Sequence, residues 1–292
     1  MLAQRIARLE RSSGEHVNAT GPRDPRFPPG VLSRLCTDAQ IHEPWFEEWC
    51  AALGEKSRSN RKVWEHAYLA HALDSLVQLR EGQRGLGFGV GREPLVALFA
   101  GRGCQILATD LPPDTEDARG WYNTAQYAGG LEGLAYPALC DPDSFRELVT
   151  WQPVDMRSVP SGLTGFDFCW SACSFEHLGS LDAGLEFVER SVATLRPGGV
   201  AVHTTEYNIG SDAATLERGP TVLYRRRDLE GLAVRLEAAG HEMAALELQP
   251  GPGVLDEYVD LPPYVDAPHL RLLYHRFVTT SVALVIRRGA DT

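Results

Sequence analysis

The segment from Arg84 to Asp110, RGLGFGVGREPLVALFAGRGCQILATD, constrains the fold more than any other part of this chain. A short apolar stretch runs into glycines at every second position, an apolar helix-like stretch follows, and a second apolar stretch ends in an aspartate. Glycine permits positive φ and lets the backbone approach a ligand closely. An acid about 20 residues beyond such a loop is the usual partner of a ribose diol. The segment therefore predicts a strand–loop–helix–strand unit that binds a nucleotide-type cofactor.

The spacing of the glycines argues against a nicotinamide cofactor. Counted from Gly85, Gly87 or Gly89, the third glycine of the GxGxxG dinucleotide fingerprint is missing. The pattern that fits is GxGxG at Gly87, Gly89 and Gly91, with Phe88 after the first glycine. It resembles motif I of the class I S-adenosylmethionine-dependent methyltransferases. The resemblance implies that these four residues hold S-adenosylmethionine, which has no pyrophosphate and does not need the third glycine that seats one.

One position departs from the pattern of the resembling family. Those proteins usually have an acid two residues before the first motif glycine, where this chain has Gly85. We expect Glu93, just beyond the loop, to take over that role. The resemblance also implies that Asp110 accepts hydrogen bonds from the ribose hydroxyls, with Leu111 beside it. The open alternative is that Asp110 caps the turn that follows the strand.

Further cofactor contacts are implied at the ends of the next two strands. Asp155 follows the third strand, and the resemblance implies that it accepts a hydrogen bond from the adenine amino group while Met156 packs on the ring. Trp170 and Ser171 end the fourth strand, next to the expected position of the methionine part of the cofactor. A turn aspartate at 155 and a core position for Trp170 are the structural alternatives.

From residue 84 onward, strand and helix patterns alternate, which predicts a mainly parallel sheet. The predicted strands are 84–88, 104–109, 150–155, 166–171, 200–205, 242–248 and 279–287. The predicted helices are 118–130, 142–149, 181–195 and 228–239, the last N-capped by Asp228 and ended by Gly240. With the resemblance, the fold class is α/β: a Rossmann-like, doubly wound, mainly parallel seven-stranded sheet with an antiparallel last strand. Ligands are then expected at the carboxyl ends of the strands.

The predicted helices and strands divide the chain into two parts. Residues 1–80 are interpreted as an N-terminal extension and helical cap, and residues 81–292 as the Rossmann-like methyltransferase domain. Aromatic and apolar residues four positions apart predict helices within residues 40–80. Within this cap, Asn60–Lys62 and Trp64–Glu65 are placed to close over the site, although Trp64 also fits the core.

Composition limits the partners. A net charge of −11 argues against bulk nucleic acid, because a phosphate-tracking surface is basic. The six cysteines form no CxxC pair, which indicates reduced thiols in the cytoplasm. The apolar stretches are too short to span a membrane. We therefore expect a cytoplasmic protein with a small-molecule or glycan acceptor, and the sequence does not indicate an oligomeric state.

Candidate catalytic residues follow the fourth predicted strand. His177 could act as a general base, because imidazole titrates near neutral pH, with Glu176 beside it. Alternatively, Glu176 and His177 bind Mg²⁺ or another divalent metal, since some methyltransferases carry ExxEH here and bind a metal; this chain has Cys173 in place of the first acid. Glu206, after the fifth strand, could complete such a site. Strand alternation puts His203 on the opposite face from Glu206.

Two further segments are candidates for acceptor contacts. Arg225, Arg226 and Arg227 could bind an anionic acceptor or form a solvated helix face. Residues 249–276 are long for a connection between strands, and such loops are often functional. Its polar and aromatic candidates are Tyr258, Asp260, Tyr264, His269 and Arg271.

The sequence as a whole predicts an S-adenosylmethionine-dependent methyltransferase whose acceptor atom is oxygen. The chain resembles bacterial methyltransferases associated with glycan biosynthesis through its segments GLGFGVGREPL, ATDLP, FEHLGSL and HTTEYN. This resemblance implies a sugar hydroxyl as the acceptor. The alternatives are a small-metabolite acceptor such as a phenol or carboxylate, an NAD-dependent oxidoreductase, and a non-catalytic cofactor-binding protein.

Overall fold

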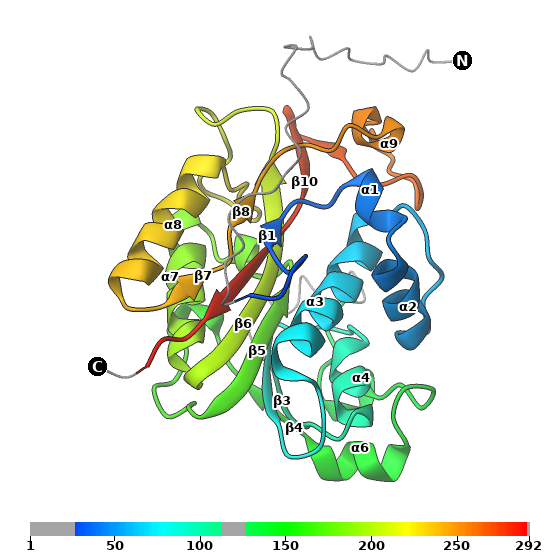
Figure 1. Ribbon diagram of the computed structural model, residues 1–292, viewed down its shortest axis with the longest axis vertical. Coiled ribbons are helices and arrows are strands. Elements are labelled where there is room, and N and C mark those ends of the chain that lie inside the picture. The colour runs from blue at the N-terminus through cyan, green and yellow to red at the C-terminus, as the bar shows by residue number, and fades with distance from the viewer. Residues whose placement is uncertain (1–26, 113–125, 291–292) are drawn as a thin grey trace.

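The computed structural model of the chain describes residues 27–112 and 126–290, which form a central sheet with helices on both faces (Figure 1). The α-helices are α1 (Asp38–Ile41), α2 (Pro44–Ala52), α3 (Arg61–Val77), α4 (Leu95–Gly101), α6 (Pro142–Leu148), α7 (Leu181–Ala193), α8 (Arg226–Ala238) and α9 (Val254–Glu257). Short 3₁₀ turns are η1 (Leu131–Leu134), η2 (Met156–Ser158) and η3 (Phe175–His177). The strands are β1 (Ser33–Arg34), β2 (Arg84–Phe88), β3 (Gln105–Asp110), β4 (Val149–Pro153), β5 (Phe166–Ala172), β6 (Leu195–Asn208), β7 (Glu242–Met243), β8 (Leu246–Glu247), β9 (Leu272–Tyr274) and β10 (Phe277–Arg287).

The strand order of the main sheet is β4-β3-β2-β5-β6-β10-β7, and β9 pairs with β10 outside this path. Strands β2 to β6 pair in parallel, whereas β10 runs antiparallel to β6. The predicted Rossmann-like fold class is thus confirmed. The chain moves outward from β2 through β3 to β4 and returns to β5 on the other side of β2. The order therefore reverses between β2 and β5, and ligands bind beside such a reversal.

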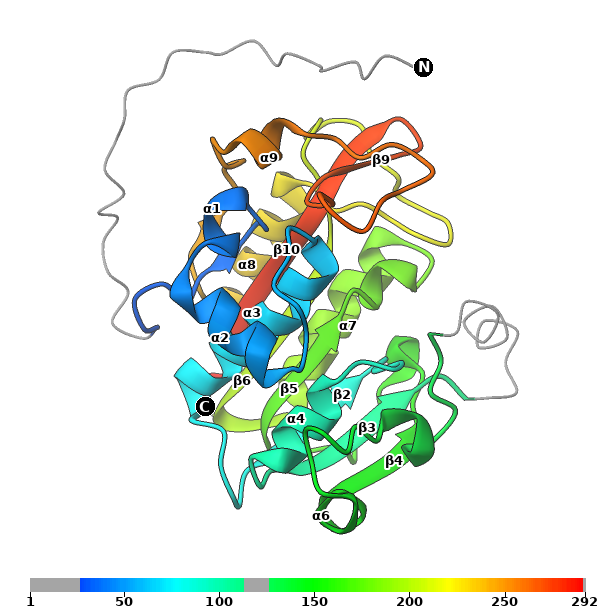
Figure 2. The same ribbon diagram turned by 90° about the vertical axis from the view of Figure 1, so that its right-hand side faces the viewer.

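Helices cover the two faces of the sheet. Figures 1 and 2 show α3, α4 and α6 on one face and α7 and α8 on the other. Successive side chains of β5 point to opposite faces of the sheet. Phe168 and Trp170 pack edge-on against Phe99 of α4 on one face, and Cys169 belongs to a second hydrophobic core on the other face. In that second core Phe88 meets Phe187 of α7 at 5.1 Å between ring centres. No helix of the described ranges combines the length and apolar character needed to cross a membrane.

The predicted strand at 242–248 is wrong in extent, because it is divided into β7 and β8. Beyond β7, the edge of β10 is taken by residues from the N-terminal part of the chain. Leu35 forms a bridge with Val282, and the Cys36 N–H donates to the Ser281 carbonyl at 2.9 Å. Strand β8 pairs with β1 in a small parallel sheet instead.

The start of α8 also differs from the prediction. Asp228 is not the N-cap: it lies in the first turn, and its carboxylate accepts from the backbone N–H of the N-cap residue Arg225 at 2.9 Å. The Asp228 carboxylate therefore caps the helix from its third residue and does not occupy the N-cap position. The end of the helix was predicted correctly, since Gly240 follows it with φ +79°.

Two other boundaries differ. The fifth predicted strand corresponds to β6, which is longer at both ends: its later part pairs with β10 as far as Asn208, and its first residue, Leu195, pairs with Phe166 of β5. The predicted helix at 118–130 lies mainly outside the described residues, and its described part, 126–130, is not helical.

The N-terminal helices pack on the sheet. Helix α3 contacts β5, β6 and β10 and shares one hydrophobic cluster with the sheet. Its N-cap is Asn60, whose side chain accepts from the Lys62 N–H at 2.8 Å and donates to the Asp266 carbonyl at 2.7 Å. The Arg61 N–H donates to the His269 carbonyl at 3.0 Å. The start of α3 is therefore fastened to residues 260–269, and both border the cavity described next.

Candidate active site

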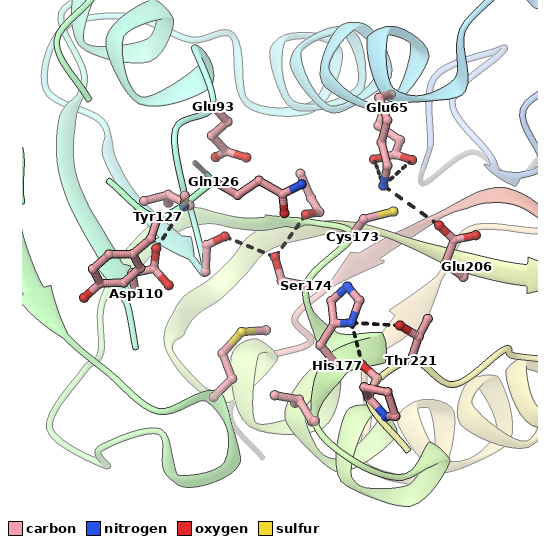
Figure 3. A pocket seen from close by; sticks show the side chains of 18 of the residues that line it. Glu65, Glu93, Asp110, Gln126, Tyr127, Cys173, Ser174, His177, Glu206 and Thr221 are labelled. Atoms are coloured by element: carbon pink, nitrogen blue, oxygen red, sulfur yellow. Dashed lines mark hydrogen bonds and ion pairs between the residues drawn. The ribbon is translucent and has the colours of Figure 1, made fainter. Parts of the chain in front are cut away.

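A cavity of about 960 Å³ opens beyond the carboxyl ends of β2, β3, β5 and β6, where the strand order predicts a ligand. One half is bordered by the glycine loop and the segments after β3 and β4. The other half is bordered by α3, the turn after β5 and the end of β6 (Figure 3). Figure 3 shows Glu93, Asp110, Gln126 and Tyr127 in the first half and Glu65, Cys173, His177, Glu206 and Thr221 in the second. We call these the loop half and the acidic half.

Two of the predicted glycines line the loop half. Gly89 and Gly91 have φ of +57° and +51°, a region that side chains rarely adopt. A Cβ at Gly89 would lie 2.9 Å from the Ser174 side chain and 3.2 Å from the Met156 sulfur, and one at Gly91 would lie 2.6 Å from the Gln126 carbonyl oxygen. The backbone itself therefore forms this wall of the cavity.

The earlier glycines and Phe88 have another role. A Cβ at Gly85 would lie 2.4 Å from the Phe168 ring, and one at Gly87 would lie 2.6 Å from the Trp170 ring. Phe88 is fully buried in the core. Gly87 and Phe88 were predicted as cofactor contacts, and the structure places them behind the cavity wall, because the pleat of β2 turns them toward neighbouring strands and helices.

Glu93 lines the cavity and is 7% exposed. Its Oε1 accepts a hydrogen bond from the Trp170 indole N–H at 2.5 Å. Burial raises the pKa of its carboxyl to about 8, although this hydrogen bond favours the ionised form. Trp170 therefore fills the space over the loop and also orients the acid that lies beyond it.

Asp110 ends β3 and faces the glycine loop, as its position in the sequence predicts. Its carboxylate accepts from the Gly91 N–H at 3.1 Å and from the Leu111 N–H at 2.8 Å. Burial raises its pKa to about 6, and the two N–H donors oppose that rise. Both Asp110 and Leu111 line the cavity. Tyr127 closes this corner, because its hydroxyl donates to the Leu111 carbonyl at 2.6 Å.

Of the two adenine contacts predicted in the segment after β4, one lines the cavity and the other is paired with a neighbouring residue. Met156 lines the cavity, as expected for a side chain that packs on a ring. Asp155 pairs with Arg157 instead: the guanidinium lies 2.9 Å from its carboxylate, and the Arg157 N–H donates to it at 2.8 Å. Burial opposes ionisation of Asp155, but Arg157 outweighs it and lowers the pKa. The acid that could meet an adenine amino group is thus held beside the cavity by its own neighbour.

Ser171 and His203 form a buried chain away from the cavity. The imidazole of His203 lies between the Ser171 and Ser191 hydroxyls, with both N–O distances 2.8 Å. Burial lowers the pKa of His203 to about 3, so that the ring is neutral. Ser171 was predicted as a cofactor contact and lies in this core network. The alternation argument is confirmed, because Glu206 lines the cavity while His203 faces the opposite side.

His177 lines the acidic half, in the turn η3 just beyond β5. Its Nδ1 lies 2.7 Å from the Pro220 carbonyl oxygen and 3.3 Å from the Thr221 hydroxyl (Figure 3). A carbonyl oxygen only accepts, so Nδ1 carries the hydrogen and Nε2 is the basic nitrogen of the neutral ring. Nε2 lies 3.9 Å from Glu176 Oε1.

Glu176 is 1% exposed and lies behind His177. Its Oε2 accepts from the Thr205 hydroxyl at 3.0 Å. Burial raises the pKa of its carboxyl, and the neighbouring His177 opposes that rise. The structure therefore places His177 at the cavity, with the buried carboxyl of Glu176 behind its Nε2.

The predicted metal ligands come together only in part. The sulfur of Cys173 and carboxylate oxygens of Glu176 and Glu206 lie within 4.8 Å of one another. His177, the third predicted ligand, is oriented by its Nδ1 contacts at one side of this group. Cations of α3 already accompany one of the two carboxylates, since Arg61 lies 2.6 Å and Lys62 3.9 Å from Glu206. The donor set resembles a metal site, but the charge of Glu206 is balanced within the protein.

For several residues that line the cavity, the sequence did not predict the position or the contacts. Glu65, Arg61 and Lys62 were placed near the site, but their pairing with Glu206 was not predicted. Thr279 was missed, and its hydroxyl donates to Glu206 at 2.9 Å. A signal existed, because three polar residues open an otherwise apolar last strand. No comparable pattern marks several other missed residues, among them Gln126, Tyr127 and Thr221.

The other candidate segments have mainly structural roles. Arg225 pairs with Asp228 at 2.8 Å and Glu217 at 3.0 Å, so it clamps the start of α8. In the segment 249–276, Asp260 and His269 bond to each other at 2.6 Å. Tyr264 and the nearby Tyr274 line the cavity.

No protein-family model and no curated protein matches the sequence. Solved structures do share its fold. The [4+2]-cyclase SpnF matches with a TM-score of 0.51 and 16% identity over 89% of this chain and 100% of that chain. An S-adenosylmethionine-dependent methyltransferase from Mesorhizobium loti matches with a TM-score of 0.45 and 15% identity, over 75% of this chain and 96% of that chain.

A further similar structure is 1,6-didemethyltoxoflavin-N1-methyltransferase from Burkholderia thailandensis with bound 1,6-didemethyltoxoflavin and S-adenosylhomocysteine. Its TM-score is 0.43 and its identity 18%, over 87% of this chain and 82% of that chain. At such identities the likeness concerns the fold, which is Rossmann-like with a mainly parallel sheet. The activity has to be argued from the cavity and its residues.

Proposed function

We propose that this protein is an S-adenosylmethionine-dependent methyltransferase that methylates an oxygen of a small polar acceptor, with a sugar or glycan hydroxyl favoured. The observation that carries the proposal is that the loop half and the acidic half belong to one cavity. Its loop half has backbone walls and the strand-end acid Asp110, and its acidic half has a histidine with one oriented nitrogen. Cofactor and acceptor would thus meet in one space at the reversal of the strand order.

The loop half fits the cofactor. Gly89 and Gly91 let the loop backbone pack closely against Ser174, Met156 and Gln126, and so expose bare backbone to the cavity. Asp110 presents a carboxylate toward a ribose diol. Met156 offers an apolar, polarisable surface to the adenine ring. Glu93 supplies the acid that the motif lacks at position 85. S-adenosylmethionine, when bound, supplies a methyl group activated by its positively charged sulfur.

His177 is proposed as the general base. Its Nδ1–H is fixed by the Pro220 carbonyl, which leaves Nε2 to take the proton of the acceptor hydroxyl. Glu176, 3.9 Å from Nε2, stabilises the imidazolium that results. Because the sulfonium is already reactive, the larger contribution of the protein is in-line alignment of the acceptor oxygen, which can supply several kcal/mol.

The acidic half favours a polyhydroxylated acceptor. Carboxylates of Glu65 and Glu206 can accept hydrogen bonds from hydroxyls, and the Tyr264 and Tyr274 rings can pack on the apolar face of a sugar. The same rings would suit a phenol, and Lys62 would suit a carboxylate, so a small-metabolite acceptor is the second candidate. The cysteine content supports a cytoplasmic site of action.

Substituting His177 tests the proposal. With isotopically labelled S-adenosylmethionine, the wild-type protein should transfer label to at least one member of a panel of sugars, phenols and carboxylates. His177→Ala and His177→Gln should lower kcat by about 100-fold or more while S-adenosylhomocysteine binds as before. Unchanged kcat in both variants would remove His177 from the mechanism. Retained cofactor binding without transfer to any acceptor would favour the non-catalytic binding protein.

A further inference from the structure

The acidic half contains a donor set of metal-binding type, and the Lys62 ammonium lies 3.9 Å from one of its members, Glu206. We propose that Lys62 is the built-in cation of the acceptor site, in the place of a divalent metal, and that removal of its charge turns Cys173, Glu176 and Glu206 into a metal site. The role of Lys62 toward an acceptor rests on the proposed function. The metal-binding part does not.

The geometry of the donors is the first observation. Their sulfur and oxygen atoms lie within 4.8 Å of one another, as ligands of one ion do. Glu176 is 1% exposed, and among the described residues its Oε1 has no hydrogen-bond partner. A buried carboxylate oxygen without a donor is costly, so this atom is directed toward a cation or a donor group.

The second observation is that α3 supplies two cations to the same place. Arg61 lies 2.6 Å from Glu206 and 3.2 Å from Glu65, and it donates to the Ser281 hydroxyl at 3.0 Å. The Lys62 ammonium lies 3.3 Å from Glu65 and 3.9 Å from Glu206. The carboxylates of Glu65 and Glu206 thus face two cations, which balance their charges and reduce the attraction of the site for a dication.

The two cations differ in freedom. The Arg61 side chain is 7% exposed and fixed by three partners, so it belongs to the framework. The Lys62 side chain is 46% exposed and lines the cavity. Loss of Lys62 would leave one uncompensated carboxylate charge beside Glu176, which is the condition for binding a divalent ion. Carboxylate oxygens suit Mn²⁺, which makes it the appropriate probe.

Lys62 can also bind an acceptor directly. An ammonium has three donors, and within the described residues its hydrogen-bond partner is Glu65. Held beside the carboxylates of Glu65 and Glu206, this ammonium can donate to an acceptor oxygen and stabilise the charge that develops there.

The test measures Mn²⁺ binding by electron paramagnetic resonance, without cofactor or acceptor. Wild type should bind no Mn²⁺ at this site, and Lys62→Arg, which keeps the charge, should behave in the same way. Lys62→Met should gain one Mn²⁺ site at least tenfold tighter than any wild-type binding. The double variant Lys62→Met with Glu206→Gln should lose it. Lys62→Gln serves as a second neutral variant if Lys62→Met unfolds.

Two results would overturn the proposal. One is a single Mn²⁺ site in wild type that Glu206→Gln abolishes, which would make the protein metal-binding despite Lys62. The other is the absence of added binding in the folded neutral variants. Because Mn²⁺ binding needs no S-adenosylmethionine, failure of the methyltransferase assignment would leave either result interpretable.

Discussion

Glu93 brings a carboxyl group into the cavity from the far side of the glycine loop, held there by the Trp170 indole at 2.5 Å. The rings of Phe168 and Trp170 occupy the space where side chains at 85 and 87 would extend. An acid at position 85 therefore has no room, and one at position 93 does. The glycines, the two rings and the displaced acid form one unit.

Glu93 should make folding stability depend on pH. Its pKa rises to about 8 on folding, so the folded chain holds a proton that the unfolded chain has lost. The resulting stabilisation is complete below the unfolded pKa, near 4.5, and is lost as the pH rises to 8. Glu93→Gln should therefore gain stability relative to wild type across this window, by up to about 1.4 kcal/mol per pH unit. Urea unfolding at pH 5, 6.5 and 8 measures it. A difference that does not change with pH would contradict the buried, protonated carboxyl.

The sequence predicts the position of a residue well when its contacts are with residues nearby in the sequence. Gly89 and Asp110 were predicted because a loop and the strand end beside it are set by adjacent residues. Phe88 and Ser171 were assigned to the cofactor from their place in the motif, but the pleat of β2 and β5 turns them into the core. The pairing of Arg61 with Glu206 joins distant parts of the chain, and no local pattern contains it.

At the scale of elements, α3 acts as a wall whose position depends on a distant loop. Asn60 caps the helix and also bonds to Asp266, and Arg58 pairs with Asp266 at 3.1 Å. The same helix start carries Arg61 and Lys62 into the cavity. The loop 260–269 thus holds the acceptor side of the site in place.

Removal of this cap should affect both stability and acceptor binding. Asn60→Ala should cost about 1–2 kcal/mol, since it removes a helix cap, and should raise the KM for the acceptor because Lys62 is displaced. Asp141→Ala is a matched control: Asp141 caps α6 through the Asp143 and Ser144 N–H groups, away from the cavity. It should cost a similar free energy of unfolding without changing KM. Equal KM in the two variants would mean that the cap does not position the site.

The elements themselves were largely predictable, because alternating strand and helix patterns are local. The positions at which individual strands and helices begin and end were not predictable in the same way. The 242–248 strand was divided because Leu35 and Cys36 occupy the neighbouring edge of β10, a contact across the whole chain. The start of α8 was misplaced because Asp228 acts on Arg225 from within the helix. Tertiary pairing decided the first case, whereas a capping contact between residues three positions apart decided the second.

At the scale of the whole molecule, the strand reversal, the glycine loop and the start of α3 converge on one cavity. Its loop half is built largely from backbone and one strand-end acid, whereas its acidic half is built from charged side chains of several elements. This division is the basis for assigning a cofactor to the first half and a polar acceptor to the second.

Calorimetric titration with S-adenosylhomocysteine, using NAD as the control ligand, tests this assignment most directly. We predict saturable binding of one S-adenosylhomocysteine per chain and none of NAD. Asp110→Ala should weaken that binding by at least about tenfold, equivalent to about 1.4 kcal/mol. Binding of NAD without S-adenosylhomocysteine, or an unchanged affinity in Asp110→Ala, would contradict the account of the glycine loop and its acid.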